Sequence, residues 1–246
     1  MKKSFTSFSL LLVLGSFFPG NSLLAQSVPE AEGRNLVRFN AGSLLFKTIS
    51  FEFEHAVASR TSVGVGLRVA PKGRLPFSNA VADLLEDDQL SEMKTGNFAI
   101  TPQVRFYFGQ GVFKGFYLSP FLRAAFYDAA VDYRFTVYDQ QRVLPLSGDF
   151  SAYTIGLAIG AQWHLGRNFY LDWAALGPHY GFSKGKVTGY QTLGPEEQEA
   201  LRQELRDLDD FPFGKIRTTV DQAGAVIDFD GPWAGLRMNV GIGYRF

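Results

Sequence analysis

Hydrophobic and polar side chains alternate with a period of two over long stretches of the chain. Between Tyr153 and Leu165 every odd-numbered residue is apolar, and the even-numbered residues are small or polar. The same alternation runs through residues 97–108 and 234–246. A period of two marks strands with two different faces, so the pattern predicts an all-β fold. The predicted strands span residues 34–46, 48–57, 61–70, 97–108, 115–128, 151–165, 168–182 and 234–246.

The connections between these eight strands alternate in length. Residues 58–60, 110–114 and 166–167 make short connections, whereas residues 71–96, 129–150 and 183–233 make long ones. The first connection, around Phe46 and Lys47, is short where a long one would fit. Short turns at one rim and long loops at the other are typical of outer-membrane barrels. The sequence therefore predicts an eight-stranded antiparallel up-and-down transmembrane β-barrel with long extracellular loops.

The alternation alone does not say which face meets lipid, because a soluble lipocalin-like barrel would turn its apolar face inward. The polar face decides between them, since it combines Arg and carboxylates with Gly, Ala, Ser and Thr. Arg pairs bidentately with carboxylates when partly buried, and small residues leave it room. We therefore expect a polar network that plugs the barrel lumen. Its expected members are Arg38, Glu52, Glu54, Arg68, Arg105, Arg123, Asp172 and Arg237.

Aromatic residues on the apolar face support an outward orientation. They gather at the two ends of the predicted strands, as the interfacial girdles of membrane barrels do. One girdle comprises Phe53, Phe106, Phe108, Phe116, Trp163, Phe169, Tyr244 and Phe246, and the other comprises Phe98, Phe126, Tyr153 and Trp233.

The last strand closes with the residues GIGYRF. With Tyr244 and the final Phe246 it resembles the assembly signal of Gram-negative outer-membrane proteins, which the barrel-assembly machinery reads. The run SLLFKTISFEFEHAVASRTSVGVG at residues 43–66 resembles the opening hairpins of an uncharacterised (domain-of-unknown-function) family of outer-membrane barrels. The chain is also similar in plan to small OmpA/OmpX-type barrels. The resemblance implies a fold and a location, and it brings no catalytic residue with it.

The first 25 residues are expected to be a signal peptide. Lys2 and Lys3 form a basic start, and Leu10 to Phe18 is an apolar stretch too short to span a bilayer. A short segment, 26–33, then leads to the barrel domain, 34–246. We expect the exported chain to reside in the cell outer membrane, with lipid and lipopolysaccharide as partners.

The composition argues against several classes of partner and site. Lys and Arg total 24 and Asp and Glu total 24, so no charge bias points to a nucleic-acid partner. The absence of Cys excludes disulfides, thiol nucleophiles and Cys-based zinc sites.

His55 and His179 are expected on the lipid face and His164 on the lumen face, so no metal site is predicted. A lipid A-modifying enzyme stays open as an alternative, with His179 as its base and Ser183 as a remote partner, and so does a small pore or transporter. No catalytic or cofactor-binding set is predicted.

The long loops carry two helical patterns. Residues 195–208 begin with Pro, carry Glu in the first turn and place Leu201, Leu205 and Leu208 on one stripe. A weaker pattern lies within Ser78 to Met93, with Val81, Leu84 and Leu85 on one side. The acidic clusters of these loops are expected to be solvated, with divalent cations shared with lipopolysaccharide phosphates as the alternative. The function favoured by the sequence is a structural or surface-interaction role through these loops.

Overall fold

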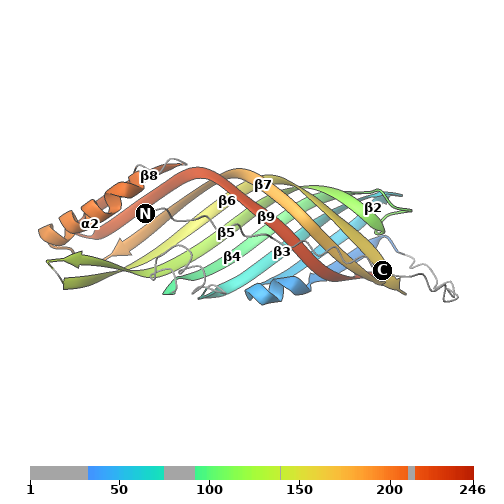
Figure 1. Ribbon diagram of the computed structural model, residues 1–246, viewed down its shortest axis with the longest axis horizontal. Helices are drawn as coiled ribbons and strands as arrows, with labels where there is room; N and C mark the ends of the chain where they lie inside the picture. Colours follow the sequence, from blue (N-terminus) through green and yellow to red (C-terminus); the bar gives the residue numbers. More distant parts are fainter. Residues whose placement is uncertain (1–32, 75–91, 139, 210–213) are drawn as a thin grey trace, which may run out of the picture.

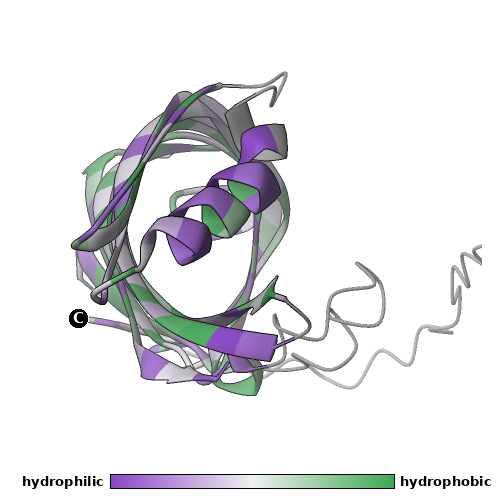
Figure 2. Ribbon diagram, turned by 90° about the vertical axis from the view of Figure 1, so that its left-hand side faces the viewer, coloured by the Kyte–Doolittle hydropathy of each residue, from purple (hydrophilic) through white to green (hydrophobic). Residues whose placement is uncertain are grey.

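The computed structural model describes residues 33–74, 92–138, 140–209 and 214–246. The predicted signal peptide and the predicted helix at residues 78–93 lie outside these ranges, apart from residues 92 and 93. The fold is all-β: one antiparallel sheet curls into a ring (Figures 1 and 2). Its strands are β1 (Asn35–Asn40), β2 (Ile49–Ala58), β3 (Thr61–Arg74), β4 (Lys94–Tyr107), β5 (Gly115–Val137), β6 (Gln140–Gly166), β7 (Phe169–Tyr190), β8 (Lys215–Asp221) and β9 (Gly224–Arg245). Among the helices in the described part of the chain, none is long and apolar enough to cross a membrane.

Each strand pairs with its neighbour in the sequence up to β7, which pairs with β9, and β9 closes the ring on β1. The closing pairs run from Leu36 opposite Arg245 to Asn40 opposite Gly241. The short connections β2–β3, β4–β5 and β6–β7 lie at this end, which we call the turn end. The opposite end, where β5–β6 and α2 extend, is the loop end.

In β6 the apolar and polar side chains lie on the two opposite faces that the sequence predicts. Ile155, Leu157 and Ile159 are 66%, 45% and 48% exposed, whereas Ala152, Ala158 and Gln162 on the other face are buried. The outside of the ring is therefore apolar and its interior is polar.

The first predicted strand, residues 34–46, is too long. The strand ends at Asn40, and a 3-10 helix, η1 (Ala41–Phe46), follows. The Asn40 side chain accepts a hydrogen bond from the Ser43 backbone N–H at 3.2 Å, and the Ser43 hydroxyl donates to the carbonyls of Asn40 and Thr48. Such local side-chain bonds compete with the sheet ladder. Lys47 then closes the turn in the left-handed region, with φ 51°.

The predicted loop 129–150 is almost entirely strand, and about half of the predicted loop 183–233 is strand. β5 and β6 stay paired as far as Val137 opposite Gln140, and β7 stays paired with β9 as far as Tyr190 opposite Gly224. Between β7 and β8 lies α2 (Pro195–Asp209), at the position predicted for the longer helical pattern. In Figure 2 this helix lies across the mouth of the ring.

The ring has eight strands at the turn end, and β8 is an extra ninth. β7 covers one edge of β9 along its whole length. On the other edge, β1 pairs with residues 241–245 and β8 with residues 224–230. Within the described residues, β9 from Gly231 to Val240 has no strand on that edge, and η1 lies against it near Val240. We call this stretch the β9 gap.

Candidate functional site: the polar interior of the ring

A network of buried charges crosses the interior near the turn end. Arg38 pairs with Glu52 at 2.7 Å and with Glu54, and Arg105 pairs with Glu52 at 2.9 Å and with Asp172 at 2.6 Å. Arg237 comes from β9, which is two strands from β2 around the ring, and it also pairs with Glu52. All but Arg237 are at most 4% exposed at the side chain. Three guanidinium groups and three carboxylates thus balance each other across strands β1, β2, β4, β7 and β9.

Strand register explains why these groups meet. Arg38 lies directly opposite Glu52 in the β1–β2 pair, and Glu54 is one inward position along. Asp172 reaches the centre from β7, where it lies opposite Gly241 of β9, so no side chain on β9 competes for the space. Small inward residues therefore make room for long charged ones.

Neutral polar groups complete the network. Tyr107 donates to Glu54 at 2.5 Å, the Ser62 hydroxyl also donates to Glu54, and Asn239 donates to Glu52 at 3.0 Å. Gln103 donates to Glu52 and accepts from Arg237. These residues were not among the predicted members, although their position on the polar face of alternating strands was a signal for them.

An aromatic layer closes the interior at the turn end, on the turn-end side of the charge network. Phe113, in the β4–β5 turn, is fully buried and meets Tyr107 and Tyr170 edge-on, with ring centroids 6.2 and 6.4 Å apart. Leu36, Ala56 and Tyr117 belong to the same cluster. The ring thus carries an apolar floor under a charged layer.

Two of the predicted members lie outside this network. Arg123 donates to the Thr101 hydroxyl at 3.3 Å and bonds to Tyr127, and it feels the positive charges of Arg68 and Arg237. Arg68 has a buried Nε without a hydrogen-bond partner within the described part of the chain. Neither has a carboxylate within ion-pairing distance among the described residues. The structure therefore places Arg38, Glu52, Glu54, Arg105, Asp172 and Arg237 together and leaves Arg68 and Arg123 uncompensated nearer the loop end.

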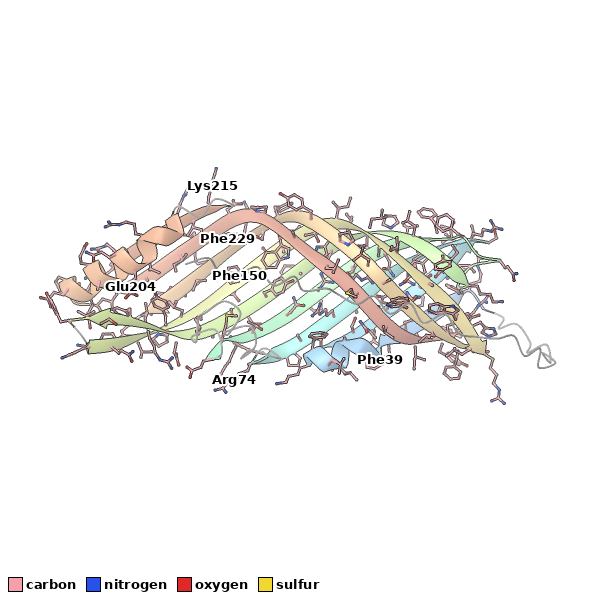
Figure 3. The ribbon with its side chains drawn as sticks, viewed as in Figure 1. Phe39, Arg74, Phe150, Glu204, Lys215 and Phe229 are labelled. Atoms are coloured by element: carbon pink, nitrogen blue, oxygen red, sulfur yellow. The ribbon has the colours of Figure 1, made fainter. Side chains whose placement is uncertain are left out.

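A cavity of about 490 Å³ lies beside Arg68, toward the loop end, and its lining includes Tyr127, to which Arg123 bonds. Its walls include Arg68 of β3, Asn97 of β4, Tyr127 of β5, Phe150 of β6 and Trp233 of β9. Two of the lining residues are labelled in Figure 3: Phe150 on β6, and Arg74 at the end of β3. The interior is therefore closed at the turn end and hollow above the charge network.

The comparison with known protein families gives one match. A family model described as a protein of unknown function (DUF3575) matches residues 21–204, which is more than half of the chain. The chain belongs to this family. The match runs from before β1 into α2, so this DUF3575 member carries β8 and β9 beyond the matched range. No curated protein matches it significantly.

The predicted position of His179 in this DUF3575 member is wrong. A bulge in β7, between Ala174 and Gly177, shifts the register against β9 and moves the following residues to the other face. His179 therefore points inward and meets buried Phe121 edge-on at 6.0 Å, while neighbouring Tyr180 is 62% exposed. Ser183, its suggested partner, donates instead to the Gly231 carbonyl at 3.3 Å.

The other histidines lie apart from His179. His55 bonds to the Asn35 side chain at 2.8 Å on the outside, and His164 bonds to the Arg167 carbonyl at 2.6 Å near the turn end. Within the described ranges, no three His, Asp or Glu side chains form a group that could hold a metal.

The expected aromatic girdles are exposed at both ends, with one correction. Phe98, Phe126 and Tyr153 are 42–45% exposed on the outside. Trp233 faces inward, where its ring lies 5.4 Å from that of Tyr127. The reason is that β9 extends beyond the predicted start at residue 234, and Trp233 then shares the inward parity of Gly235 and Arg237.

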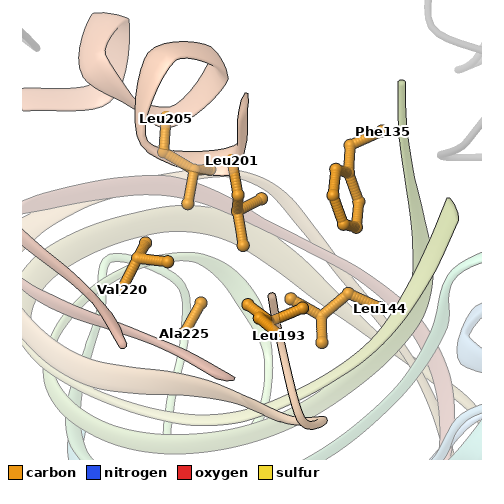
Figure 4. Packing of buried hydrophobic residues seen from close by; sticks show 7 residues of the cluster. All are labelled: Phe135, Leu144, Leu193, Leu201, Leu205, Val220 and Ala225. Carbon is orange, nitrogen blue, oxygen red and sulfur yellow. The ribbon is translucent and has the colours of Figure 1, made fainter. Parts of the chain in front are cut away.

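The helix α2 is fastened over the interior at the loop end. Leu201 and Leu205 are buried against Phe135, Leu144 and Val220 of the surrounding strands (Figure 4). The remaining members of this cluster are Leu193 and Ala225. The side chain of Leu208, the third residue of the predicted stripe, lies outside the described residues.

Polar contacts add to this attachment. Glu204 accepts from the Tyr133 hydroxyl at 3.0 Å, and Arg202 donates to the Val220 carbonyl at 2.8 Å. Arg142 of β6 pairs with Glu197 at 3.2 Å. A hydrogen bond to Glu196 raises the pKa of the nearby Tyr138 phenol, because the neutral phenol is the donor. The helix thus contacts β5, β6 and β8 at once.

Proposed function

We propose that this DUF3575 member is an outer-membrane β-barrel with a closed interior, which presents its extended loop end to the exterior. The observation that carries the proposal is the inversion of the usual pattern of burial. Arg38, Glu54 and Asp172 are at most 1% exposed, whereas Ile155, Leu122 and Met238 are more than half exposed. A soluble protein rarely leaves a continuous apolar surface of more than a few hundred Å² open to water.

The apolar outer surface has dimensions that suit a membrane. On β6 it runs from Tyr153 to Leu165, and twelve residue steps at about 3.3 Å cover roughly 40 Å along the strand. A strand tilted by about 40° then spans roughly 30 Å, close to the hydrocarbon thickness of a bilayer. Exposed aromatic residues lie at both ends of this surface, among them Phe126 and Phe169.

The interior supports a plugged barrel over a diffusive pore. An eight-stranded barrel has an interior that side chains about fill, and here the charge network lies on an aromatic floor that includes Phe113 and Tyr170. We therefore propose a structural or surface-interaction role, performed by the β5–β6 extension, α2 and the β8–β9 hairpin.

Electrophoresis of washed membranes tests the proposal. The membrane fraction is washed in high salt and then run in SDS with and without boiling, with detection of this chain. A membrane barrel stays with the fraction, and its unboiled band migrates differently from its boiled band. Release by salt together with an absent heat shift would refute the proposal.

Recordings in planar bilayers test the closed interior separately. Pure refolded protein is expected to give no reproducible conductance steps, because the network and the aromatic floor fill the cross-section. Regular steps from the pure protein would replace the plugged barrel by a small pore or transporter.

A further inference from the structure

The interior carries more positive than negative charge. Arg38, Arg105 and Arg237 are matched by Glu52, Glu54 and Asp172, which leaves Arg68 and Arg123 without a described carboxylate partner. Burying an unpaired charge is costly unless a counter-charge meets it. Two such cations, close enough to repel each other, indicate a place for an anion.

Polar atoms beside the cavity are open to a ligand. The Arg68 Nε is buried and has no hydrogen-bond partner within the described residues. Arg68 lines the cavity, and so do the cationic residues Lys47 and Arg74. Asp128, the acidic residue in the same lining, is already paired with Lys72 at 3.3 Å, so it does not neutralise Arg68. The hydrogen-bonding groups therefore suit an anionic oxygen.

The remainder of the cavity is apolar. Phe46, Pro71, Phe150 and Trp233 contribute to its walls. Phe46 and Pro71 come from one side of the β9 gap, and Trp233 comes from β9 itself. The lining therefore joins a cationic interior to a stretch of wall without a strand, next to the apolar outer surface.

We propose that this cavity binds an anionic amphiphile, whose charged head group lies on Arg68, near the positive charge of Arg123, and whose apolar chain runs along Phe46 and Trp233 toward the β9 gap. The site rests on the interior geometry alone. Entry of the ligand from the side rests in addition on the proposed membrane insertion. A fatty-acid carboxylate and a lipid phosphate share the required chemistry.

Equilibrium binding to the full chain in a non-ionic detergent tests the site. The probes are laurate, dodecyl phosphate, dodecanol, butyrate and inorganic phosphate, and the fluorescence of Trp233 reports binding as the difference between wild type and Trp233→Phe. We expect laurate or dodecyl phosphate to bind at least tenfold more tightly than dodecanol, butyrate or inorganic phosphate. The tighter of the two ligands identifies the source of the head group.

Charge variants test the assigned residues. Arg68→Gln is expected to lose about tenfold or more in affinity for the anionic amphiphile, whereas Arg68→Lys keeps most of it. Arg123→Gln removes only a neighbouring positive charge and is expected to lose less than Arg68→Gln. Arg167→Gln, in the exposed β6–β7 turn, is the matched control and binds as wild type does. The heat shift of each variant, measured on the same samples, verifies that the ring is intact.

Two results would overturn the proposal. One is equal binding of dodecanol and laurate, which would make the cavity a neutral apolar pocket. The other is wild-type affinity in Arg68→Gln with an intact heat shift. Failure of the heat shift in wild type, with ligand selectivity preserved, would refute the membrane barrel and leave the binding site standing.

Discussion

Replacement of Glu52 by Gln isolates the charge balance of the network with little change in shape. Glu52 accepts from Arg38 at 2.7 Å, Arg105 at 2.9 Å, Asn239 at 3.0 Å and also from Arg237. The variant leaves three buried guanidinium groups facing two carboxylates. Removing one partner of a buried ion pair typically costs about 3–5 kcal/mol, and we expect Glu52→Gln to lose free energy of unfolding in this range.

Urea titration in detergent, followed by tryptophan fluorescence, measures this loss. Asp230→Asn is the matched control, because Asp230 pairs with Lys184 at 3.4 Å while both side chains are more than half exposed. Exposed pairs contribute about 0–1 kcal/mol, so the control unfolds close to wild type. The reasoning is refuted if Glu52→Gln, with an unchanged slope against urea, also unfolds within about 1 kcal/mol of wild type.

Three further perturbations probe the floor, the helix and the outer surface. Phe113→Ala removes the centre of the aromatic layer and is expected to cost about 3–5 kcal/mol in the same titration, against a smaller loss for Val112→Ala. Leu201→Asp detaches α2, so trypsin cleaves the helix faster while the heat shift is retained, and exposed Gln203→Asp serves as its control. Leu157→Arg places a charge on the proposed lipid surface and is expected to cost about 2–4 kcal/mol, which lowers the yield of refolding into lipid vesicles.

Each of these has a contrary outcome. Equal losses in Phe113→Ala and Val112→Ala would mean that the turn end is not closed by the aromatic layer. Unchanged proteolysis of Leu201→Asp would mean that polar contacts alone hold α2. Normal refolding of Leu157→Arg would favour a solvated outer surface, as in a soluble barrel.

Much of the ring follows from local sequence because the alternation is unbroken where one face is apolar. In β6 the parity of residues 153–165 assigns each side chain to its face, and α2 follows from Pro195 and the spacing of Leu201 and Leu205. The extension of β5 beyond residue 128 was missed because charged residues, such as Asp132 and Arg134, interrupt the apolar face there. Pairing with β6 continues through them.

The candidate site was harder to predict because it depends on parity over long distances. The bulge between Ala174 and Gly177 was not predicted, although Gly177 and Pro178 are residue types that often mark a bulge within a strand. It reverses the face of His179 and of every later residue in β7. The separation of Arg68 and Arg123 from the network depends on how far along the ring each strand places its side chain. The alternation of faces tells which side chains point inward, but it does not tell at which level along the ring axis they lie.

The brevity of β1 has a consequence for the order of assembly. Its ladder with β9 joins residues about 200 positions apart through five pairs, from Leu36 to Asn40. By contrast, β5 pairs with β6 along its whole length, from Val137 opposite Gln140 to Gly115 opposite Gln162. Contacts between distant residues carry the largest loop-closure cost and form late. The β5–β6 hairpin can therefore nucleate early. The β1–β9 ladder is the last strand pairing to form, and it is the first place at which a foreign strand could pair.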